Sequence, residues 1–188
     1  MRWFWLDRFT EFVSGSHATA VKAVALSEEH LHDHWPAYPL MPHSLIAEGM
    51  AQTGGLLVSE TYRFKELVVL AKFSKCIFHG ETRPGDVLTY HAQIEHASED
   101  GASVKVVAHV KDHLQAEAEI FFARLQTQDL NSSVEGPEGA TRLFNPAHLL
   151  HWLRLVAVFD VGTTPDGQRL RPADYGFETT DGSDSLVP

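Results

Sequence analysis

Residues 42–60, which read PHSLIAEGMAQTGGLLVSE, decide the fold of this chain. The stretch starts with a proline and is rich in Ala, Leu and Met, a composition that favours a helix. Between Leu45 and Val58, apolar and small residues fall on almost every helical face, so the pattern predicts a helix enclosed by other elements. At about 1.5 Å per residue, this part of the helix spans roughly 21 Å, enough to run the depth of a small curved sheet.

Three glycines interrupt the expected helix, at positions 49, 54 and 55. Glycine weakens a helix intrinsically, because it loses more backbone freedom on folding than other residues do. Their presence in this helix predicts the close approach of another backbone.

Six further segments show the alternating or continuous apolar patterns, rich in β-branched residues, that are typical of strands. They are residues 4–13, 19–26, 67–78, 87–96, 103–110 and 115–125. Residues 98–101, SEDG, suit a hairpin loop, and the last four runs are expected to form an antiparallel meander. The predicted fold class is therefore α+β, an antiparallel curved sheet wrapped around a central helix.

The composition changes once, near residues 126–140, where Gln, Thr, Asp, Asn, Ser, Gly and Pro dominate. We therefore expect a main domain over 1–126 and a tail over 127–188. Asn145 and Pro146 precede an apolar run, which predicts a helix over about 145–159 after a linker. The Gly-, Asp- and Ser-rich remainder predicts an irregular terminus.

The composition also limits the partners and the location. With 188 residues and 44% apolar residues, the chain is long enough for one buried core. A net charge of −10 without a Lys/Arg-rich block argues against nucleic acid, and no apolar run approaches the roughly 20 residues of a membrane span. The charged start, MRWFWLDR, does not suit a signal peptide, and the single Cys76 fits a reducing compartment. We expect a cytoplasmic protein with no membrane association.

Titratable groups and a stiff loop precede the central helix. The groups are His30, His32, Asp33 and His34. The loop, WPAYPLMP at 35–42, contains three prolines, each of which fixes φ and restricts the residue before it. On a strand, the period-2 histidines would share one face as metal ligands, whereas solvated loop histidines beside Glu28 and Glu29 are the commoner explanation. We expect no metal and no cofactor.

The stretch from His34 to Gln52, HWPAYPLMPHSLIAEGMAQ, resembles the signature of the β-hydroxyacyl-acyl carrier protein dehydratases of fatty-acid synthesis. In that family His-Phe-Pro opens the motif, Pro-x-Met-Pro leads into a helix, a carboxylate lies fourteen residues after the histidine, and Met-Ala-Gln follows. Glu48 lies fourteen residues after His34. The resemblance spans roughly residues 3–126, including the turn RPGD at 83–86, and does not cover the tail.

The resemblance implies a hotdog fold and a homodimer in which the two sheets join, and it allows a larger oligomer. It further implies an active site in which His34 of one subunit meets Glu48 of the other. The implied reaction converts a (3R)-3-hydroxyacyl thioester of acyl carrier protein or coenzyme A into the trans-2-enoyl thioester. Glutamate at position 48 resembles the branch of the family that dehydrates without isomerising the double bond.

The chemistry of dehydration asks for these residue types. It needs a base for the α-proton, an acid for the departing hydroxyl and a group that holds charge on the thioester oxygen. His34 suits the base, because imidazole titrates near neutral pH. Glu48 suits the group that binds or protonates the hydroxyl, and the apolar neighbours at 45, 46 and 50 are expected to raise its pKa by desolvation. Which of the two residues delivers the proton stays open.

The start of the central helix suits the oxyanion site. Behind Pro42, the backbone N–H groups of His43 and Ser44 lack intrahelical partners and lie at the positive end of the helix dipole. Where the family has glycine, this chain has Ala37 in the loop and His43 at the helix start. The His43 side chain is expected to narrow the pocket, to add a second titratable group to the site, or to point into solvent.

Supporting roles and rival functions complete the expectations. Pro36, Pro42 and Gln52 are expected to support the site, and Lys72, Lys75 and Arg83 are either solvated charges or contacts for an acidic carrier protein or a pantetheine phosphate. One rival function is a hotdog acyl thioesterase that uses a carboxylate on the same helix. The other is a non-catalytic acyl-thioester-binding module, in which the two glycine replacements have ended the chemistry.

Overall fold

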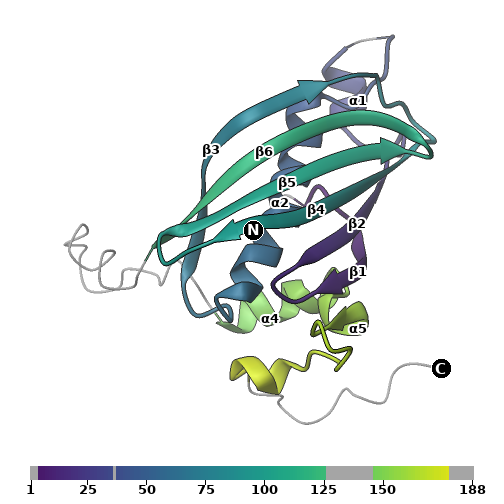
Figure 1. Cartoon of the computed structure of the whole chain (residues 1–188). Helices are drawn as coiled ribbons and strands as arrows, with labels where there is room; N and C mark the ends of the chain where they lie inside the picture. The colour runs from purple at the N-terminus through teal and green to yellow at the C-terminus, as the bar shows by residue number, and fades with distance from the viewer. Residues whose placement is uncertain (1–3, 36, 126–145, 178–188) are drawn as a thin grey trace, which may run out of the picture.

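The computed structural model describes residues 4–35, 37–125 and 146–177, and we refer to its elements by the labels in Figure 1. In chain order they are β1 (Arg8–Val13), β2 (His17–Ala23), α1 (His30–Asp33), α2 (His43–Thr61), β3 (Leu67–Phe78), β4 (Val87–Ala97), β5 (Gly101–Val110), β6 (His113–Leu125), α4 (Pro146–Leu155), α5 (Val158–Val161), β7 (Gly162–Thr163) and the 3₁₀ helix η1 (Pro172–Tyr175). The expected central helix and all six expected strands are present, with ends shifted by a few residues.

Seven strands form one sheet in the order β3-β6-β5-β4-β2-β1-β7, which curves around α2 (Figure 1). All neighbouring pairs are antiparallel except β1 and β7, which are parallel. The expectation that the last four strands form a meander is wrong for β3, which pairs with β6 instead of β4. Tight turns force β4, β5 and β6 to be neighbours, whereas the longer connection over residues 79–86 lets the chain cross to the other side of β5 and β6.

Helix α2 lies inside the curve of the sheet, as its sequence predicts. Its buried residues occur on nearly every face: Ile46, Gly49, Met50, Ala51, Gln52, Thr53, Gly54, Leu56, Leu57, Val58 and Glu60. Its first turns are the exception, because His43, Ser44 and Glu48 are exposed. The buried body of the helix thus carries an open amino-terminal end. Within the described ranges, no helix is long and apolar enough to cross a bilayer.

The glycines of α2 meet different neighbours. A Cβ built on Gly49 would lie 2.6 Å from the backbone oxygen of Trp5 and 2.4 Å from the hydroxyl of Tyr90, so the expected backbone approach occurs here. At Gly54 and Gly55 the nearest neighbour is the Phe122 side chain, at 3.2 Å from the built Cβ. Only the first glycine therefore marks a close backbone contact.

The tail packs on the edge of the sheet beside β1. The Phe9 N–H donates to the Val156 carbonyl at 2.8 Å, and β7 extends the sheet beyond β1. Helix α4 starts at the expected proline but ends earlier than expected, because Ala157 adopts a left-handed φ of 61° before α5 begins. Leu153 and Val158 are fully buried.

The segment after α5 is more ordered than its composition suggests. Its apolar residues Leu170, Tyr175 and Phe177 are buried, and the Tyr175 ring lies 5.2 Å from the ring of Phe64 and 5.9 Å from that of Phe159. A few apolar side chains are enough to order this segment, because they pack against aromatic side chains of the rest of the protein. The expected linker and the last residues of the tail, 126–145 and 178–188, lie outside the described residues.

Candidate active site

His34 ends a single helical turn that the sequence did not reveal. Its N–H donates to the His30 carbonyl at 3.3 Å, and its exposed ring lies edge-on to Trp35 at 5.5 Å between centroids. Because residues 30–33 are helical, the histidines do not line one face of a strand as the metal alternative required. The described parts of the chain contain no group of three or more side chains able to hold a metal ion.

The loop before α2 is pinned to the loop between β3 and β4. The Tyr38 hydroxyl donates to Glu81 Oε2 at 2.8 Å, and the Met41 N–H donates to the Thr82 carbonyl at 2.8 Å. Ala37 has a φ of 65°, a conformation that costs a non-glycine residue about 1 kcal/mol. Alanine thus keeps the backbone that glycine would adopt freely. Pro36 lies outside the described residues, whereas Pro42 is buried and caps α2.

The amino-terminal turn of α2 offers unused backbone donors. Among the described residues, no acceptor bonds the N–H of His43 or Ser44, and both residues are exposed. The His43 ring stacks on Phe78 of β3, with 4.3 Å between the centroids and 3° between the planes. The ring is thus exposed where the start of α2 meets β3. This position is compatible with each of the three expectations: a ring that narrows the pocket, a second titratable group in the site, or a ring that faces solvent.

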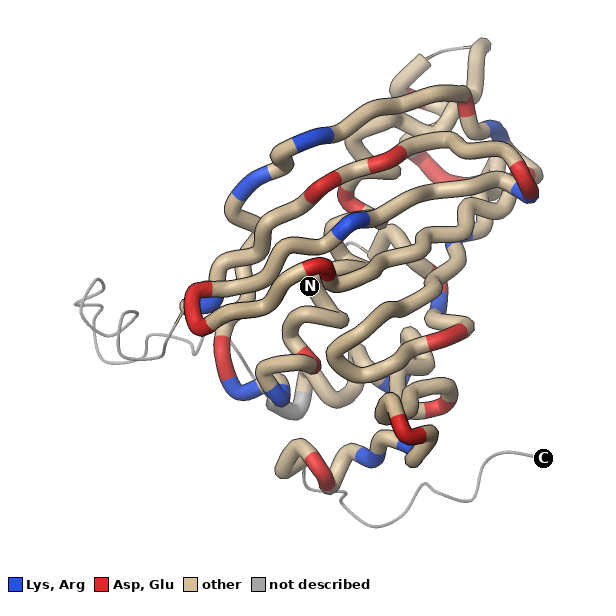
Figure 2. Tube along the Cα trace, in the orientation of Figure 1, with Lys and Arg blue, Asp and Glu red and all other residues tan. Residues whose placement is uncertain are grey.

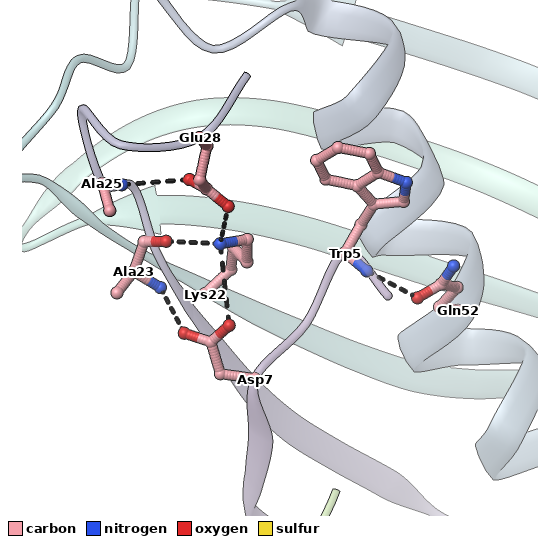
Figure 3. Close-up of polar contacts among 7 residues, drawn as sticks. All are labelled: Trp5, Asp7, Lys22, Ala23, Ala25, Glu28 and Gln52. Carbon is pink, nitrogen blue, oxygen red and sulfur yellow. Dashed lines mark hydrogen bonds and ion pairs between the residues drawn. The ribbon is translucent and has the colours of Figure 1, made fainter. Parts of the chain in front are cut away.

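Glu48 lies one turn further along α2 and is held by Gln52. Gln52 Nε2 donates to Glu48 Oε1 at 2.9 Å. Gln52 Oε1 accepts the backbone N–H of Trp5 at 2.9 Å, as Figure 3 shows. Of the three residues expected to desolvate Glu48, Ile46 and Met50 do not do so within one chain, because their side chains are fully buried while Glu48 is exposed, and Leu45 is only half-buried. At about 100° per residue, positions 46 and 50 point to the sheet and position 48 points away from it.

His34 and Glu48 are not linked to each other in the described part of one chain. Both side chains are exposed, and no hydrogen bond or ion pair between described residues joins them. Glu48 is instead bonded to Gln52, and the His34 ring lies against the Trp35 ring.

A buried lysine cluster beside the site was missed by sequence reasoning. Lys22, only 5% exposed, donates to Glu28 Oε1 at 2.7 Å and to the Ala23 carbonyl at 2.5 Å, and lies 3.6 Å from Asp7 Oδ1 (Figure 3). Burial raises the pKa of Glu28, but the hydrogen bonds from Lys22 and the Ala25 N–H outweigh it and hold the pKa below its ordinary value. The available signal was a lysine inside the apolar run TAVKAVAL at 19–26.

His30 is the second missed residue. Its ring lies edge-on to the Trp5 ring at 5.0 Å, and its buried Nε2 has no hydrogen-bond partner among the described residues. Burial lowers the pKa of this imidazole, while the carboxylate of Glu28 opposes the shift. The neutral form of His30 is therefore favoured next to the turn that carries His34.

Two of the three basic residues expected to contact a carrier protein are paired with carboxylates. Lys75 lies 3.4 Å from Glu117, and Arg83 lies 2.8 Å from Glu81, whereas Lys72 is exposed with no ion-pair partner among the residues described. The hydrogen bonds from Arg83 and Tyr38 hold the pKa of Glu81 below its ordinary value. Figure 2 shows basic and acidic residues interspersed along β3, β6 and β5. These strands thus carry a mixed charge pattern and no continuous basic patch.

The chain is similar in sequence to a known family over its main domain. A family model described as FabA-like domain matches residues 3–119. The 3-hydroxyacyl-[acyl-carrier-protein] dehydratase FabZ of Listeria welshimeri is 37% identical over 119 residues, which cover 63% of this chain and 83% of the relative. The matched region contains the loop, the central helix and all candidate site residues.

Solved structures share the fold at low sequence identity. The dehydratase heterocomplex ApeI:P from Xenorhabdus doucetiae has a TM-score of 0.56 at 15% identity, covering 70% of this chain and 90% of that one. A hypothetical thioesterase protein from Streptococcus pneumoniae, solved with coenzyme A, has a TM-score of 0.53 at 13% identity, covering 63% and 84%. Together with the sheet curved around α2 (Figure 1), these likenesses confirm the expected hotdog fold.

Proposed function

Because the chain belongs to the FabA-like family, we propose that it is a 3-hydroxyacyl-[acyl-carrier-protein] dehydratase. This lyase removes water from a (3R)-3-hydroxyacyl thioester to give the trans-2-enoyl thioester, in the synthesis of fatty acids or of related lipids and polyketides. The observation that carries the proposal is Glu48, exposed on the open end of an otherwise buried helix, fourteen residues after His34. We also propose that the protein is cytoplasmic and that its main domain ends at residue 126.

The site residues divide the reaction among them. His34 takes the α-proton of the thioester, and Glu48 binds the 3-hydroxyl, which leaves as water once it receives a proton from either Glu48 or the protonated His34. The free N–H groups of His43 and Ser44 point at the thioester oxygen, where negative charge develops as the proton departs. Gln52 keeps the Glu48 carboxylate in place through its 2.9 Å hydrogen bond. No metal or cofactor takes part in these steps.

The complete site belongs to a homodimer in this proposal. Two observations support it: within the described residues of one chain no hydrogen bond or ion pair links His34 to Glu48, and β3 is the last strand of the sheet, with no described strand on its outer side. Leu70 and Ile77 on this strand are 44% and 39% exposed, and an edge strand with exposed apolar side chains is a template for pairing with another chain. Pairing of two copies of β3 would join the sheets and bring His34 of one subunit to Glu48 of its partner.

The substrate is carried by acyl carrier protein or coenzyme A. The relative from Listeria supports the former by its name, and the exposed Lys72 is the free cation on β3 for an acidic carrier among the described residues of that strand. Because Lys75 and Arg83 are already paired with acids, we assign them a smaller part in carrier binding.

The test is hydration of a 2-enoyl thioester, the reverse reaction, followed by loss of the conjugated double bond and by release of free thiol. The proposal expects hydration without thiol release, and loss of hydration in His34→Ala and Glu48→Gln while both variants stay folded. Thiol release would identify the rival thioesterase, whose fold the chain shares with the pneumococcal protein. Tight acyl binding without either reaction would identify a binding module.

Mixed dimers test the shared site separately. His34→Ala and Glu48→Gln chains, each inactive alone, are unfolded together and refolded as a mixture. If each site takes its two groups from different chains, one of the two sites in a mixed dimer is intact, and about a quarter of the wild-type activity returns. No recovery in a mixture shown to contain mixed dimers would mean that each site uses one chain only.

A further inference from the structure

Trp5 lies between the two helices that carry the candidate catalytic groups. Its ring meets the His30 ring of α1 edge-on, with 5.0 Å between the centroids, and its backbone N–H donates to Gln52 Oε1 of α2 at 2.9 Å. Its carbonyl packs so closely on Gly49 that a Cβ there would lie 2.6 Å away. One residue of the amino-terminal segment therefore contacts α1 and α2 at once, as Figure 3 shows for its bond to Gln52.

The contact with α2 decides how Gln52 presents its side chain. A backbone N–H can only donate, so the amide oxygen of Gln52 must face Trp5. The amide nitrogen then faces Glu48 and donates to it at 2.9 Å. The opposite orientation would place two acceptors, the amide oxygen and the carboxylate, against each other. The position of the Trp5 backbone thus determines the orientation in which the Gln52 amide donates its hydrogen bond to Glu48.

The contact with α1 acts on His34 through a short helical turn. His30 and His34 are four residues apart and are linked by the 3.3 Å bond from the His34 N–H to the His30 carbonyl. A single turn has few bonds of its own, so its position depends on packing. The Trp5 ring on His30 supplies such packing.

Lys22 holds the segments that carry Trp5 and His30. It contacts Asp7, two residues after Trp5, and Glu28, two residues before His30 (Figure 3). Asp7 Oδ2 also accepts the Ala23 N–H at 2.7 Å, and Glu28 Oε2 accepts the Ala25 N–H at 3.0 Å. The amino-terminal segment and the approach to α1 are therefore both tied to the end of β2 and the residues just after it, which brings the rings of Trp5 and His30 together.

We propose that Trp5 is a positioning residue for the dehydration reaction, which holds α1 and α2 in one arrangement so that His34 and Glu48 keep the orientations that catalysis needs. The inference rests on the proposed function. In a dimer with shared sites, the backbone of each Trp5 acts on Glu48 of one site, and its ring acts on His34 of the other site. Loss of the ring from both chains therefore impairs both sites through His34, without removing any group that touches substrate.

The experiment compares kcat and KM for 2-enoyl thioester hydration in the full chain and in three variants. In Trp5→Ala we expect kcat to fall about tenfold or more with KM changed less than about threefold, because misplaced groups slow the chemical step. Trp5→Phe, which keeps an aromatic ring against His30, is expected to recover most of the loss. Phe4→Ala is the matched control, because the Phe4 ring packs on Trp152 of the tail, 5.3 Å away, and its kcat should be unchanged.

An equal kcat in wild type and Trp5→Ala would overturn the inference, and so would an equal loss in Phe4→Ala. If Trp5→Ala does not fold, Trp5→Leu replaces it, and the inference then expects a lower kcat for leucine than for phenylalanine at similar KM. Equal values for these two variants would overturn it.

A readout without catalysis separates this inference from the proposed function. The titration of His30 is followed by NMR in wild type and in Trp5→Ala, with Glu28, Lys22 and His34 as the charged neighbours that act on it. Removal of the ring should expose His30 and move its pKa upward, toward the ordinary value. If the wild type shows no hydration, the proposed function fails, and an unmoved His30 titration would then also overturn the positioning role.

Discussion

Gly49 lies where α2 meets the amino-terminal segment, and it has no room for a side chain. An added Cβ would lie 2.4 Å from the Tyr90 hydroxyl and 2.6 Å from the Trp5 carbonyl, and Tyr90 is fully buried. Gly49→Ala should therefore lower the free energy of unfolding by about 1–3 kcal/mol, despite the better helix propensity of alanine. Urea denaturation measures this loss. Gly55→Ala, which meets only the Phe122 ring at 3.2 Å, is the control and should change stability much less.

Lys22 is the residue whose loss should couple stability to pH. Lys22→Met leaves Glu28 and Asp7 without their cation, and since Glu28 is a quarter exposed and Asp7 nearly half exposed, we expect a loss of about 2 kcal/mol at neutral pH. The folded pKa of Glu28 lies below its ordinary value of 4.5. Its contribution is therefore complete above pH 4.5 and is lost as the pH falls through the folded pKa.

The measurement is denaturation of both proteins between pH 7 and pH 3. The difference in free energy of unfolding between wild type and Lys22→Met should shrink as Glu28 becomes protonated. Glu99→Gln serves as a control, since Glu99 is exposed and its side chain has no ion pair in the described chain. A difference that stays constant across this pH range would show that the lysine acts through packing alone.

Helix α2 and the strands follow from the sequence because periodicity records which faces are buried. β3 was expected at residues 67–78, where the structure has it, and α2 was expected as an enclosed helix. The pairing of β3 with β6 was not predictable in this way, because a strand pattern carries no record of its neighbour. The turn α1 was missed because a four-residue helix has too few residues to show a period.

The candidate site was predictable where it follows a motif along the chain. His34, Glu48 and Gln52 are predicted from the resemblance to the dehydratase signature, and the structure adds the hydrogen bond between the last two. Trp5 and Lys22 were not named, because their contacts join segments far apart in sequence. The bond from Trp5 to Gln52 spans 47 residues, and no local pattern marks it.

β3 is the element on which the proposed dimer depends. Ile77→Lys, together with Leu70→Lys, should place two charges on the apolar edge and shift the protein to monomers, with loss of hydration activity if the site is shared. Size-exclusion chromatography with light scattering measures the shift. Val87→Lys on β4, 48% exposed in wild type and away from this edge, is the matched control. A dimer that persists with full activity in the double variant would rule out the β3 edge.

The tail extends the molecule beyond residues 3–119, the region that matches the FabA-like domain, and its contacts show that it completes the fold. Leu153 and Val158 are fully buried, and the Tyr175 hydroxyl donates to the buried Glu60 at 2.6 Å, beside the 2.8 Å bond from Ser14. Without the tail, the apolar surface beneath it and the edge of β1 would face water.

A chain ending at residue 126 should therefore aggregate or melt at a lower temperature than the full chain, because the buried tail residues of α4, α5 and η1 no longer cover the main domain. Light scattering and a thermal melt measure both effects. A chain ending at residue 177 keeps all described tail contacts and should match the full chain. If the shorter chain stays monodisperse and melts at the same temperature, the tail contributes nothing to the stability of the domain, and its role must then be sought in the oligomer or at the acyl-binding site.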